Sequence, residues 1–535
     1  MTALSYQAAV SPELVREETI GDLLRQAVGA APEVCALVEG VAEPAARRRW
    51  SYQELFAEAE NAAGALLGRF EPGERIAVWA NNIPEWTILQ LGAALAGMTL
   101  VTVDPALRKS ELRHVLGTSK AAGIFLRQEY RDNPMAATVN ELRPELPALR
   151  EVVQFERWQE FAESGTATAL PEVKPGDTAQ IQFTSGTTGV PKGVVLHHSG
   201  LVNSARLSYA RVLRLERAEP FLNTMPLFHT AGSVLATLSP IVATATHVLM
   251  PFFDPGLYLR LIGEEHSVVF GGVPTMLRAL LDHPDMPSAD TSSVRFALSG
   301  GAVVPPELVT RVEQTLGVPM AIIFAQTEAS PAITMIDPFA DSADDRANTL
   351  GRPVAGVEVA VKTGGQVVPT GERGELCTRG FHVMTGYLDL PEQTAEAIDA
   401  QGWLHTGDLA RMDERGYCRI DGRVKDMIIR GGENLFPREI EEALARHPGV
   451  AEVVVVGVPD EHWGEQPAAF VRTRPGVALT EDELVAFGRQ HLARQKVPRV
   501  WRFVESMPTT GSGKVQRFEL RGRLLGEQPA TQDGD

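Results

Sequence analysis

The sequence predicts an α/β protein with a large N-terminal domain of parallel αβα sheets and a small antiparallel β-barrel region, followed by a small α+β C-terminal domain. Short apolar, β-branched runs alternate with helical patterns over most of the 535 residues, which is typical of parallel sheets. From about Gly371 glycines become frequent and the apolar segments short and alternating, as in antiparallel strands. A smaller unit of helices and strands follows Arg423.

Strands of parallel sheets are expected at five apolar runs, Arg75–Ala80, Ala179–Phe183, Ser267–Phe270, Val294–Leu298 and Met320–Phe324. The stretch Ile88–Val103 is apolar but short and interrupted, so we expect a buried helix that runs into a strand rather than a membrane span. Antiparallel strands are expected at Gly374–Thr378 and Gly416–Ile420.

The C-terminal unit is expected to alternate between helices and strands. In order, we expect a helix at Pro437–Arg446, a strand at Ala451–Val458, a helix at Thr480–Leu492 and a strand near Val500–Glu505. The junction is placed around Arg423–Asp426, which divides the chain into residues 1–424 and 425–535. A C-terminal domain of ~110 residues has an ordinary size.

Composition excludes some classes of partner. The formal net charge of -18 makes the chain a poor general binder of nucleic acid, which requires a basic face. The cysteines, Cys35, Cys377 and Cys418, lack paired spacing, and the first residues lack the order of a signal peptide. We therefore expect a cytoplasmic protein with no nucleic-acid or membrane partner. The sequence does not decide whether the protein forms a homodimer.

One glycine-rich segment carries the clearest chemistry. Directly after the apolar run Ile181–Phe183 the chain reads Thr184-Ser185-Gly186-Thr187-Thr188-Gly189-Val190-Pro191-Lys192-Gly193. Three glycines allow a tight backbone whose N–H groups can face an anion, and the hydroxyls and Lys192 add donors and a charge that suit phosphate. It is not a Walker A loop, since glycine follows the lysine. A flexible surface loop is the alternative, which the position after a buried strand disfavours.

These residues resemble those of the adenylate-forming (ANL) superfamily, which includes acyl-CoA synthetases, adenylation domains of peptide synthetases and beetle luciferases. The segment Phe324-Ala325-Gln326-Thr327-Glu328 is similar to the family's Tyr-Gly-x-Thr-Glu segment, and Pro508–Val515 is similar to its terminal lysine segment. The resemblance covers nearly the whole chain in the expected order. It implies an AMP-forming acid–thiol ligase, an acyl-CoA synthetase, that uses ATP, Mg²⁺ and coenzyme A.

The resemblance implies an ATP/AMP site assembled from several turns. Phosphates would lie at Thr184–Gly189, including Ser185, Gly186, Thr187 and Thr188. Gly301, Ala302 and Val303 would line the adenine with Phe324, Ala325 and Gln326, and Asp408 and Arg423 would bind the ribose. Glu328 would hold Mg²⁺, which takes few carboxylates besides phosphate oxygens.

Four residues are expected to act on the reacting groups, namely Lys192, Thr327, Glu328 and Lys514. Thr327 would contact the α-phosphate, and Lys514 would reach both the carboxylate and the α-phosphate. A cation between two approaching anions removes repulsion and stabilises the transition state.

The C-terminal domain is mobile in the family, and the resemblance makes Lys425 its hinge. An element terminus of this kind can absorb large dihedral changes. Arg430, Gly431 and Gly432 resemble the loop that faces the pantetheine of CoA, although a simple β-turn explains this stretch equally well.

The acyl pocket is expected at His229, Thr275, Gly300 and Ser330. His229 lies in a segment that resembles the family's acyl gate, and the aspartate of amino-acid-activating relatives is absent from Pro226–Gly232. Small or apolar residues favour a hydrophobic acid, whether aliphatic, aromatic or polycyclic.

Two departures from the family pattern lead to an alternative function. Phe324 lacks the tyrosine hydroxyl, and Ala325 adds a methyl group where the family has glycine. A misplacement of ~1 Å can cost a large factor in rate. One alternative is thus a ligase that only forms thioesters from a preformed adenylate. Acyl transfer to a carrier protein and a non-catalytic nucleotide- or acyl-binding protein are the others.

Overall fold

The computed structural model describes residues 3–165, 169–184, 191–509 and 515–526. The chain forms two compact units. The larger unit comprises Tyr6–Val359 and Cys377–His405, and the smaller comprises Met1–Ser5, Ala360–Leu376 and Thr406–Asp535.

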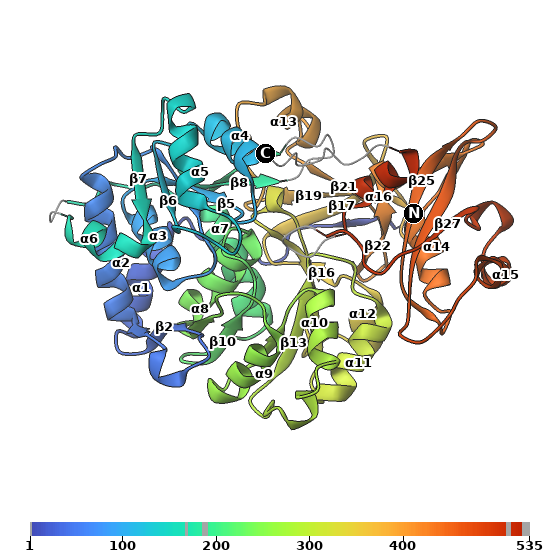
Figure 1. Cartoon of the computed structure of the whole chain (residues 1–535), viewed down its shortest axis with the longest axis horizontal. Coiled ribbons are helices and arrows are strands. Elements are labelled where there is room, and N and C mark those ends of the chain that lie inside the picture. The colour runs from blue at the N-terminus through green and yellow to red at the C-terminus, as the bar shows by residue number, and fades with distance from the viewer. Residues whose placement is uncertain (1–2, 166–168, 185–190, 510–514, 527–535) are drawn as a thin grey trace. The chain divides into compact units, whose positions relative to one another are not determined.

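A seven-stranded sheet forms one half of the larger unit (Figure 1). Its order is β20 (Gly386–Tyr387), β9 (Lys192–His197), β8 (Thr178–Thr184), β5 (Thr99–Val103), β4 (Arg75–Trp79), β6 (Gly123–Leu126) and β7 (Glu151–Gln154). The strands from β8 to β7 are parallel, whereas β9 is antiparallel to β8 and β20 is antiparallel to β9. The strands predicted at Arg75–Ala80 and Ala179–Phe183 are confirmed as β4 and β8.

Helices cover this sheet through their apolar faces. Helix α2 (Tyr52–Leu67) begins at a capping box in which Ser51 and Glu54 satisfy each other's backbone N–H groups. Helix α3 (Pro84–Leu95) is buried almost throughout and leads into β5, which confirms the predicted helix-to-strand stretch. Helices α4 (Lys109–Ser119) and α5 (Met135–Leu142) contribute buried side chains to the same core as Val101 and Ile181.

A second sheet of the larger unit has the order β12 (Val269–Gly271), β13 (Phe296–Gly300), β14 (Met320–Ala325), β15 (Ala332–Met335) and β16 (Arg352–Pro353). Its first three strands are parallel and confirm the three remaining predicted strands. Helices α10 (Pro274–Leu281) and α11 (Pro306–Leu316) follow β12 and β13. A four-stranded sheet contains β10 (Pro220–Asn223), β11 (Thr246–Leu249), β2 (Cys35–Glu39) and β3 (Arg49–Ser51).

The predicted antiparallel region is a six-stranded sheet, with the order β1 (Tyr6–Gln7), β17 (Val357–Thr363), β19 (Gly374–Gly380), β21 (Leu404–Met412) and β22 (Cys418–Arg423), and with β18 (Gln366–Val367) beside β17. Strands β21 and β22 are antiparallel. The segment predicted at Gly374–Thr378 falls in β19, and the segment predicted at Gly416–Ile420 overlaps β22, which begins at Cys418.

The C-terminal part of the smaller unit has the predicted α14 (Pro437–Leu444), β25 (Val450–Asp460), α15 (Glu481–His491) and β27 (Val500–Phe503). Three further strands were not predicted from the sequence, namely β23 (Ile428–Arg430), β24 (Glu433–Leu435) and β26 (Gly464–Thr473). Strand β26 lies between β25 and β27. Pro467 within it has no N–H to donate, and such a residue is usually found in an edge strand. The proline is tolerated because the β27 pairing starts only at Ala468.

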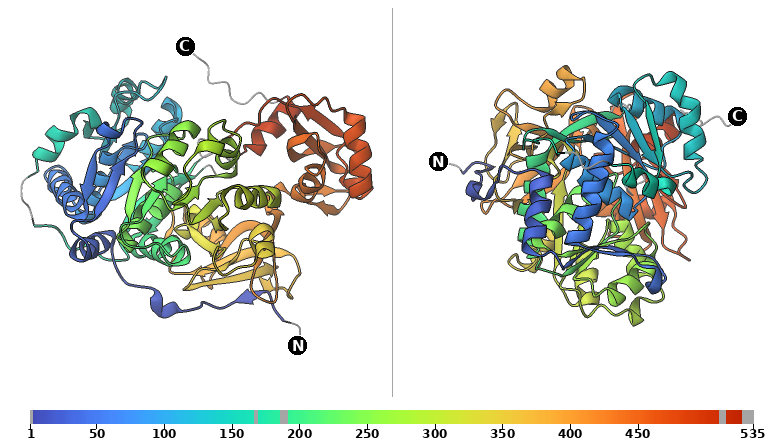
Figure 2. Two further views of the ribbon diagram at one scale, coloured as in Figure 1. Left: turned by 90° about the horizontal axis from the view of Figure 1, so that it is seen from below. Right: turned by 90° about the vertical axis from the view of Figure 1, so that its left-hand side faces the viewer.

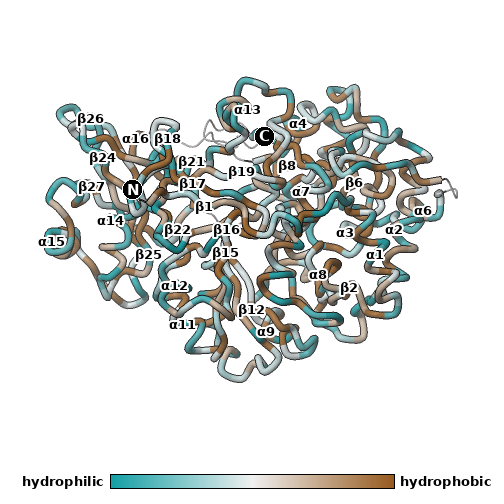
Figure 3. Tube along the Cα trace, turned by 180° about the vertical axis from the view of Figure 1, so that it is seen from behind, coloured by the Kyte–Doolittle hydropathy of each residue, from teal (hydrophilic) through white to brown (hydrophobic). Residues whose placement is uncertain are grey.

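Strand β25 has an uninterrupted apolar run because helices cover both faces of its sheet (Figure 2). Val453 and Val455 pack in one core with Leu444 of α14, whereas Val454 and Val456 pack on the opposite face with Leu520 of α16 (Arg517–Leu525). Figure 3 shows the hydrophobic segments along strands and inner helix faces, with more hydrophilic outer loops. Within the described residues, the helices are too short or too polar to cross a membrane.

Candidate active site

Two turns of the predicted nucleotide site follow neighbouring parallel strands, at the edge of the sheet where such folds bind ligands. Gly300 ends β13 opposite Ile323 of β14, and a Cβ at Gly300 would lie 2.6 Å from the Ile323 side chain. Glycine is therefore needed here for strand packing, besides any part in the acyl pocket. The exposed residues Gly301, Ala302 and Val303 follow, and Gly301 has a φ of 75°.

Strand β14 ends in the segment that resembles the family's Tyr-Gly-x-Thr-Glu sequence. Phe324, Ala325 and Gln326 are half-buried, and the pairing with β15 shifts register between Phe324 and Ala325. A one-turn 3-10 helix, Thr327–Ala329, follows immediately. This turn places Thr327 and Glu328 beyond the strand end.

Thr327 is held by Gln182, a residue that was not predicted from the sequence. The Nε2 of Gln182, on β8, donates a hydrogen bond of 3.0 Å to the hydroxyl oxygen of Thr327, and both side chains are buried. The Nε2 of Gln180 lies 3.4 Å from both the Oε1 of Gln182 and the hydroxyl of Ser233. A buried glutamine inside an apolar strand gives no sequence signal for a role at a distant turn.

The same strand β8 leads into the predicted phosphate loop. Thr184 is its last residue and pairs with Lys192, the first residue of β9. Ser185, Gly186, Thr187, Thr188 and Gly189 lie outside the described residues. The described flanks place Lys192 on the sheet whose Gln182 reaches the Thr327 turn.

Tyr387 contacts both Lys192 and Glu328, and it too was missed. Its hydroxyl donates a hydrogen bond of 3.0 Å to the Glu328 carboxylate, and the Lys192 ammonium lies 4.8 Å from its ring centroid. Burial, and then the charge and hydrogen bond of Glu328, raise the pKa of the phenol, so it stays a donor at neutral pH. The Gly-Tyr pair lies in a short strand and has no distinctive spacing in the sequence.

The residues around Glu328 fit Mg²⁺. The carboxylate is half-buried beside the flanks of the phosphate loop, and Thr327 adds an oxygen next to it. Mg²⁺ binds through one or two carboxylates and takes its other ligands from phosphates and water. Glu328 is thus a suitable protein ligand for Mg²⁺ carried by ATP.

The predicted acyl-pocket residues lie on four segments of the larger unit, one of which ends at Gly300, described above. The Nδ1 of His229 accepts a hydrogen bond of 3.1 Å from the backbone N–H of Ala231, and the His229 carbonyl accepts one of 3.2 Å from Ser233. Thr275 is exposed in the first turn of α10. Ser330 is fully buried after the Thr327 turn, with a φ of 58°.

In the smaller unit the structure brings the predicted ribose pair together. Asp408 and Arg423 are opposite each other on β21 and β22, and Arg423 Nε donates to the Asp408 carboxylate at 3.0 Å. Lys425 follows in a 3-10 turn, Val424–Asp426. Burial, and then Arg423, lower the pKa of Lys425, and the carboxylates of Asp426 and Asp408 oppose this shift.

The predicted CoA loop is a two-residue hairpin between β23 and β24. Gly431 and Gly432 have φ values of 59° and 83°, as this kind of turn requires. The Arg430 guanidinium lies 4.7 Å from the Trp463 ring centroid, and the Gly431 N–H donates to the Trp463 carbonyl at 2.7 Å. A Cβ at Gly431 would lie 2.7 Å from the indole. The hairpin is therefore seated on Trp463.

Lys514 lies outside the described residues. The segment before it ends at Thr509, which pairs with Val515 in an isolated bridge.

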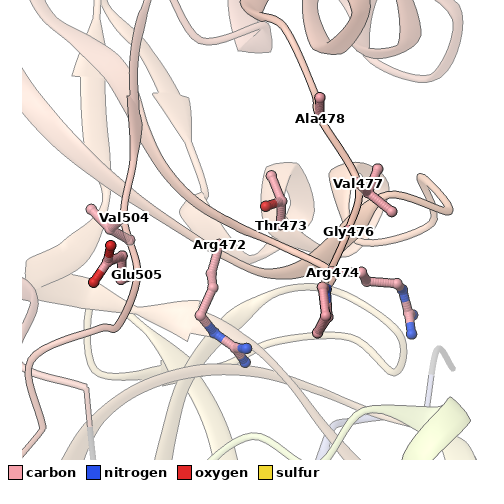
Figure 4. Close-up of a pocket in the computed structure, with 9 residues that line it drawn as sticks. Arg472, Thr473, Arg474, Gly476, Val477, Ala478, Val504 and Glu505 are labelled. Carbon is pink, nitrogen blue, oxygen red and sulfur yellow. The ribbon is translucent and has the colours of Figure 1, made fainter.

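A cavity of about 560 Å³ in the smaller unit is separate from these residues (Figure 4). Arg472 and Arg474 line it together with Glu505. Glu452 accepts a hydrogen bond from Arg472 at 3.2 Å. The lining thus carries two arginines and one glutamate, and one of the two arginines is paired with Glu452 outside the lining.

Comparison with known proteins decides the family. The model of the AMP-binding enzyme family matches residues 24–388, and that of the AMP-binding enzyme C-terminal domain matches residues 439–514. The chain belongs to the AMP-binding enzyme family. A putative acyl-CoA synthetase, YngI of Bacillus subtilis (strain 168), is 38% identical over 539 residues, which cover 95% of this chain and 97% of the relative.

Further members of the AMP-binding enzyme family are similar over most of their length. A propanoyl:CoA ligase of Rhodococcus jostii (strain RHA1), whose acyl group carries a methyl-dioxo-octahydroindenyl ring system, is 37% identical over 88% of this chain and 93% of its own. The mitochondrial medium-chain acyl-CoA ligase ACSF2 of Rattus norvegicus is 33% identical over 97% and 90%.

A solved structure supports the same assignment. The anthranilate CoA ligase AuaEII, in complex with anthranoyl-AMP, superposes with a TM-score of 0.86 at 25% identity, covering 96% of this chain and 99% of that one. The fold is that of the ANL superfamily, and the protein is an AMP-forming acyl-CoA ligase.

Proposed function

We propose that this ligase joins a hydrophobic carboxylic acid to coenzyme A in two steps. A carboxylate oxygen attacks the α-phosphorus of ATP and pyrophosphate leaves; the CoA thiol then attacks the acyl carbon and AMP leaves. The observation that carries the proposal is the convergence of Lys192, on the seven-stranded sheet, with Thr327 and Glu328, which follow β14 of the five-stranded sheet. Gln182 and Tyr387 link the two sheets at this point.

In the first step, the described residues bind and orient the triphosphate. Lys192 supplies a positive charge for the phosphates, and the Thr327 hydroxyl donates to the α-phosphate while it accepts from Gln182. Glu328 would hold the Mg²⁺ of ATP, which would supply positive charge beside the phosphates. Lys514 is assigned to the carboxylate and α-phosphate, and Asp408 with Arg423 to the ribose.

In the second step, the hairpin Arg430–Gly432 borders the path of the pantetheine arm. Its glycines let a thin thiol-bearing chain pass close to the backbone. Lys425 serves as the hinge between the two steps. CoA is the acceptor in this proposal, and the enzyme acts in the cytoplasm.

The hydrophobic class of the acid rests on two lines of support. Apart from His229, the residues assigned to the pocket, Gly300, Thr275 and Ser330, are small and uncharged. The relatives named above act on medium-chain, polycyclic and aromatic acyl groups. Aliphatic, aromatic and polycyclic acids are therefore all candidates.

A second candidate function is thioester formation from a preformed adenylate. It is favoured by Ala325, which stands at the end of β14 where the family segment has glycine. If adenylation is impaired there, Ala325→Gly should increase ATP-dependent turnover. An unchanged rate would remove the basis for this candidate.

Paired reactions analysed by mass spectrometry test the proposal. A panel of aliphatic, aromatic and polycyclic acids is supplied either with ATP, Mg²⁺ and CoA, or as preformed adenylates with CoA. Acyl-CoA in both arms is expected and identifies the acid. Product only from the adenylates would establish the second candidate, and product in neither arm would contradict both.

A further inference from the structure

Tyr387 is fixed by its backbone before its side chain reaches the site. Strand β20 pairs with β9 in the register Gly386↔Val195 and Tyr387↔Val194. The Tyr387 N–H donates to the hydroxyl of Thr394 at 2.9 Å, and a Cβ at Gly386 would lie 2.8 Å from that threonine. Glycine at position 386 thus lets β20 lie close against helix α13 (Pro391–Ala397).

This register brings the ring beside Lys192. Lys192 and Val194 are two residues apart on β9 and point to the same face, so Lys192 is the diagonal neighbour of Tyr387. The lysine ammonium lies 4.8 Å from the ring centroid, within the range of a cation–π contact.

The hydroxyl of the same ring reaches the opposite charge. It donates to Glu328 at 3.0 Å, and the backbone N–H of Met384, three residues before Tyr387, donates to the Glu328 carbonyl at 2.9 Å. One segment therefore holds both the backbone and the carboxylate of Glu328.

Lys192 and Glu328 have opposite charges and would attract each other if nothing separated them. A direct ion pair would occupy the lysine needed for phosphate and the carboxylate needed for Mg²⁺, and binding of Mg²⁺·ATP would have to break it. The tyrosine instead gives each group an uncharged partner, because its ring faces the ammonium and its hydroxyl donates to the carboxylate.

We propose that Tyr387 is a positioning residue of the adenylation step, which keeps Lys192 and Glu328 apart and oriented for Mg²⁺·ATP. This inference rests on the proposed function of the site. It assigns two separate parts of one side chain: the ring positions the lysine, and the hydroxyl positions the carboxylate.

Two variants separate these parts. Tyr387→Phe keeps the ring and removes the hydroxyl. The main expected change is therefore that adenylate formation needs a several-fold higher Mg²⁺ concentration to reach half of its maximal rate. Tyr387→Leu removes both, and we expect the rate of adenylate formation in a single turnover to fall by on the order of 10-fold. Formation of acyl-CoA from preformed adenylate should stay within about two-fold in both variants.

Binding gives a readout that does not depend on turnover. Calorimetric titration with Mg²⁺·ATP should show weaker binding in both variants. When a chelator removes the metal, the affinity for ATP should be lower in Tyr387→Leu than in wild type, whereas Tyr387→Phe should bind ATP nearly as wild type does. The matched control is Tyr52→Phe, which removes a buried hydroxyl that donates to the carbonyls of Pro240 and Ala245, away from these residues. This control should leave the ratio of the adenylation rate to the thioester-formation rate as it is in the wild type.

A double-mutant cycle makes the assignment specific. The effect of Tyr387→Phe on Mg²⁺·ATP binding should largely vanish in a Glu328→Gln background, because the hydroxyl acts through that carboxylate. Additive effects, equal losses in both half-reactions, or unchanged Mg²⁺·ATP binding in the variants would each overturn the inference. Failure of the wild-type chain to form an adenylate would instead overturn the proposed function.

Discussion

Replacing Gln182 by leucine tests whether the buried amide orients Thr327 for adenylation. Leucine is similar in size, so the change removes hydrogen bonds more than volume. Gln182 is 3% exposed and Thr327 7%, so water cannot readily replace the 3.0 Å hydrogen bond between them. A buried polar group left without its partner costs about 1–3 kcal/mol.

This cost converts into an expected rate. If about 1.4 kcal/mol of this free energy is added to the activation free energy of adenylate formation, that step slows by about 10-fold. The acyl-CoA yield from a preformed adenylate should change little, because Thr327 is assigned to the α-phosphate during the first step. Single-turnover measurements of the two half-reactions, with acid and ATP or with synthetic adenylate, give both rates.

The matched control is Gln90→Leu. Gln90 is equally buried at 3% exposure, and its amide donates to the Ser233 carbonyl at 2.9 Å instead of to the nucleotide turn. It should lower the melting temperature comparably without slowing adenylation selectively. If Gln182→Leu slowed both half-reactions equally, or if Gln90→Leu also slowed adenylation without slowing thioester formation, the reasoning would be refuted.

Two further predictions concern the CoA hairpin and acid stability. Gly431→Ala should slow thioester formation much more than Gly432→Ala, because only the first new Cβ meets Trp463, at 2.7 Å; equal effects on CoA-dependent turnover would contradict the seating of the hairpin. Burial lowers histidine pKa values from 6.5 to about 4 in His198 and to about 3 in His247 and His382. The unfolded chain takes up protons below about pH 6.5 and these folded sites do not, so the free energy of unfolding should fall as pH falls from about 6.5 to about 4, by up to about 1.4 kcal/mol per pH unit for each histidine. Urea denaturation at several pH values measures the slope, which His247→Leu should reduce and which a pH-independent stability would contradict.

Much of the fold was predictable because its strands leave a local signal. Strand β14 reads as an apolar run that ends in polar residues, and β25 as a continuous run of valines between two helical cores. Strand β26 was missed because Pro467 breaks the pattern, and only its neighbours in the sheet show that the proline is tolerated there.

Some site residues were likewise predictable from their local sequence, whereas others were identified only from the three-dimensional structure. The pairing of Asp408 with Arg423 follows from segments whose sequence resembles the family. Gln182 and Tyr387 could not be identified, because each acts on a residue that is 145 or 59 positions away, and the three-dimensional arrangement alone brings them together.

The central claim is that the acid is activated as an acyl-adenylate, and an oxygen-labelling experiment tests it most directly. Acid labelled with ¹⁸O in both carboxylate oxygens is converted with ATP, Mg²⁺ and CoA, and the nucleotide product is analysed by mass spectrometry. Attack of the carboxylate on the α-phosphorus predicts AMP that carries one heavy oxygen. Unlabelled AMP, or unlabelled ADP together with label in inorganic phosphate (the products of attack on the γ-phosphorus through an acyl phosphate), would contradict the account.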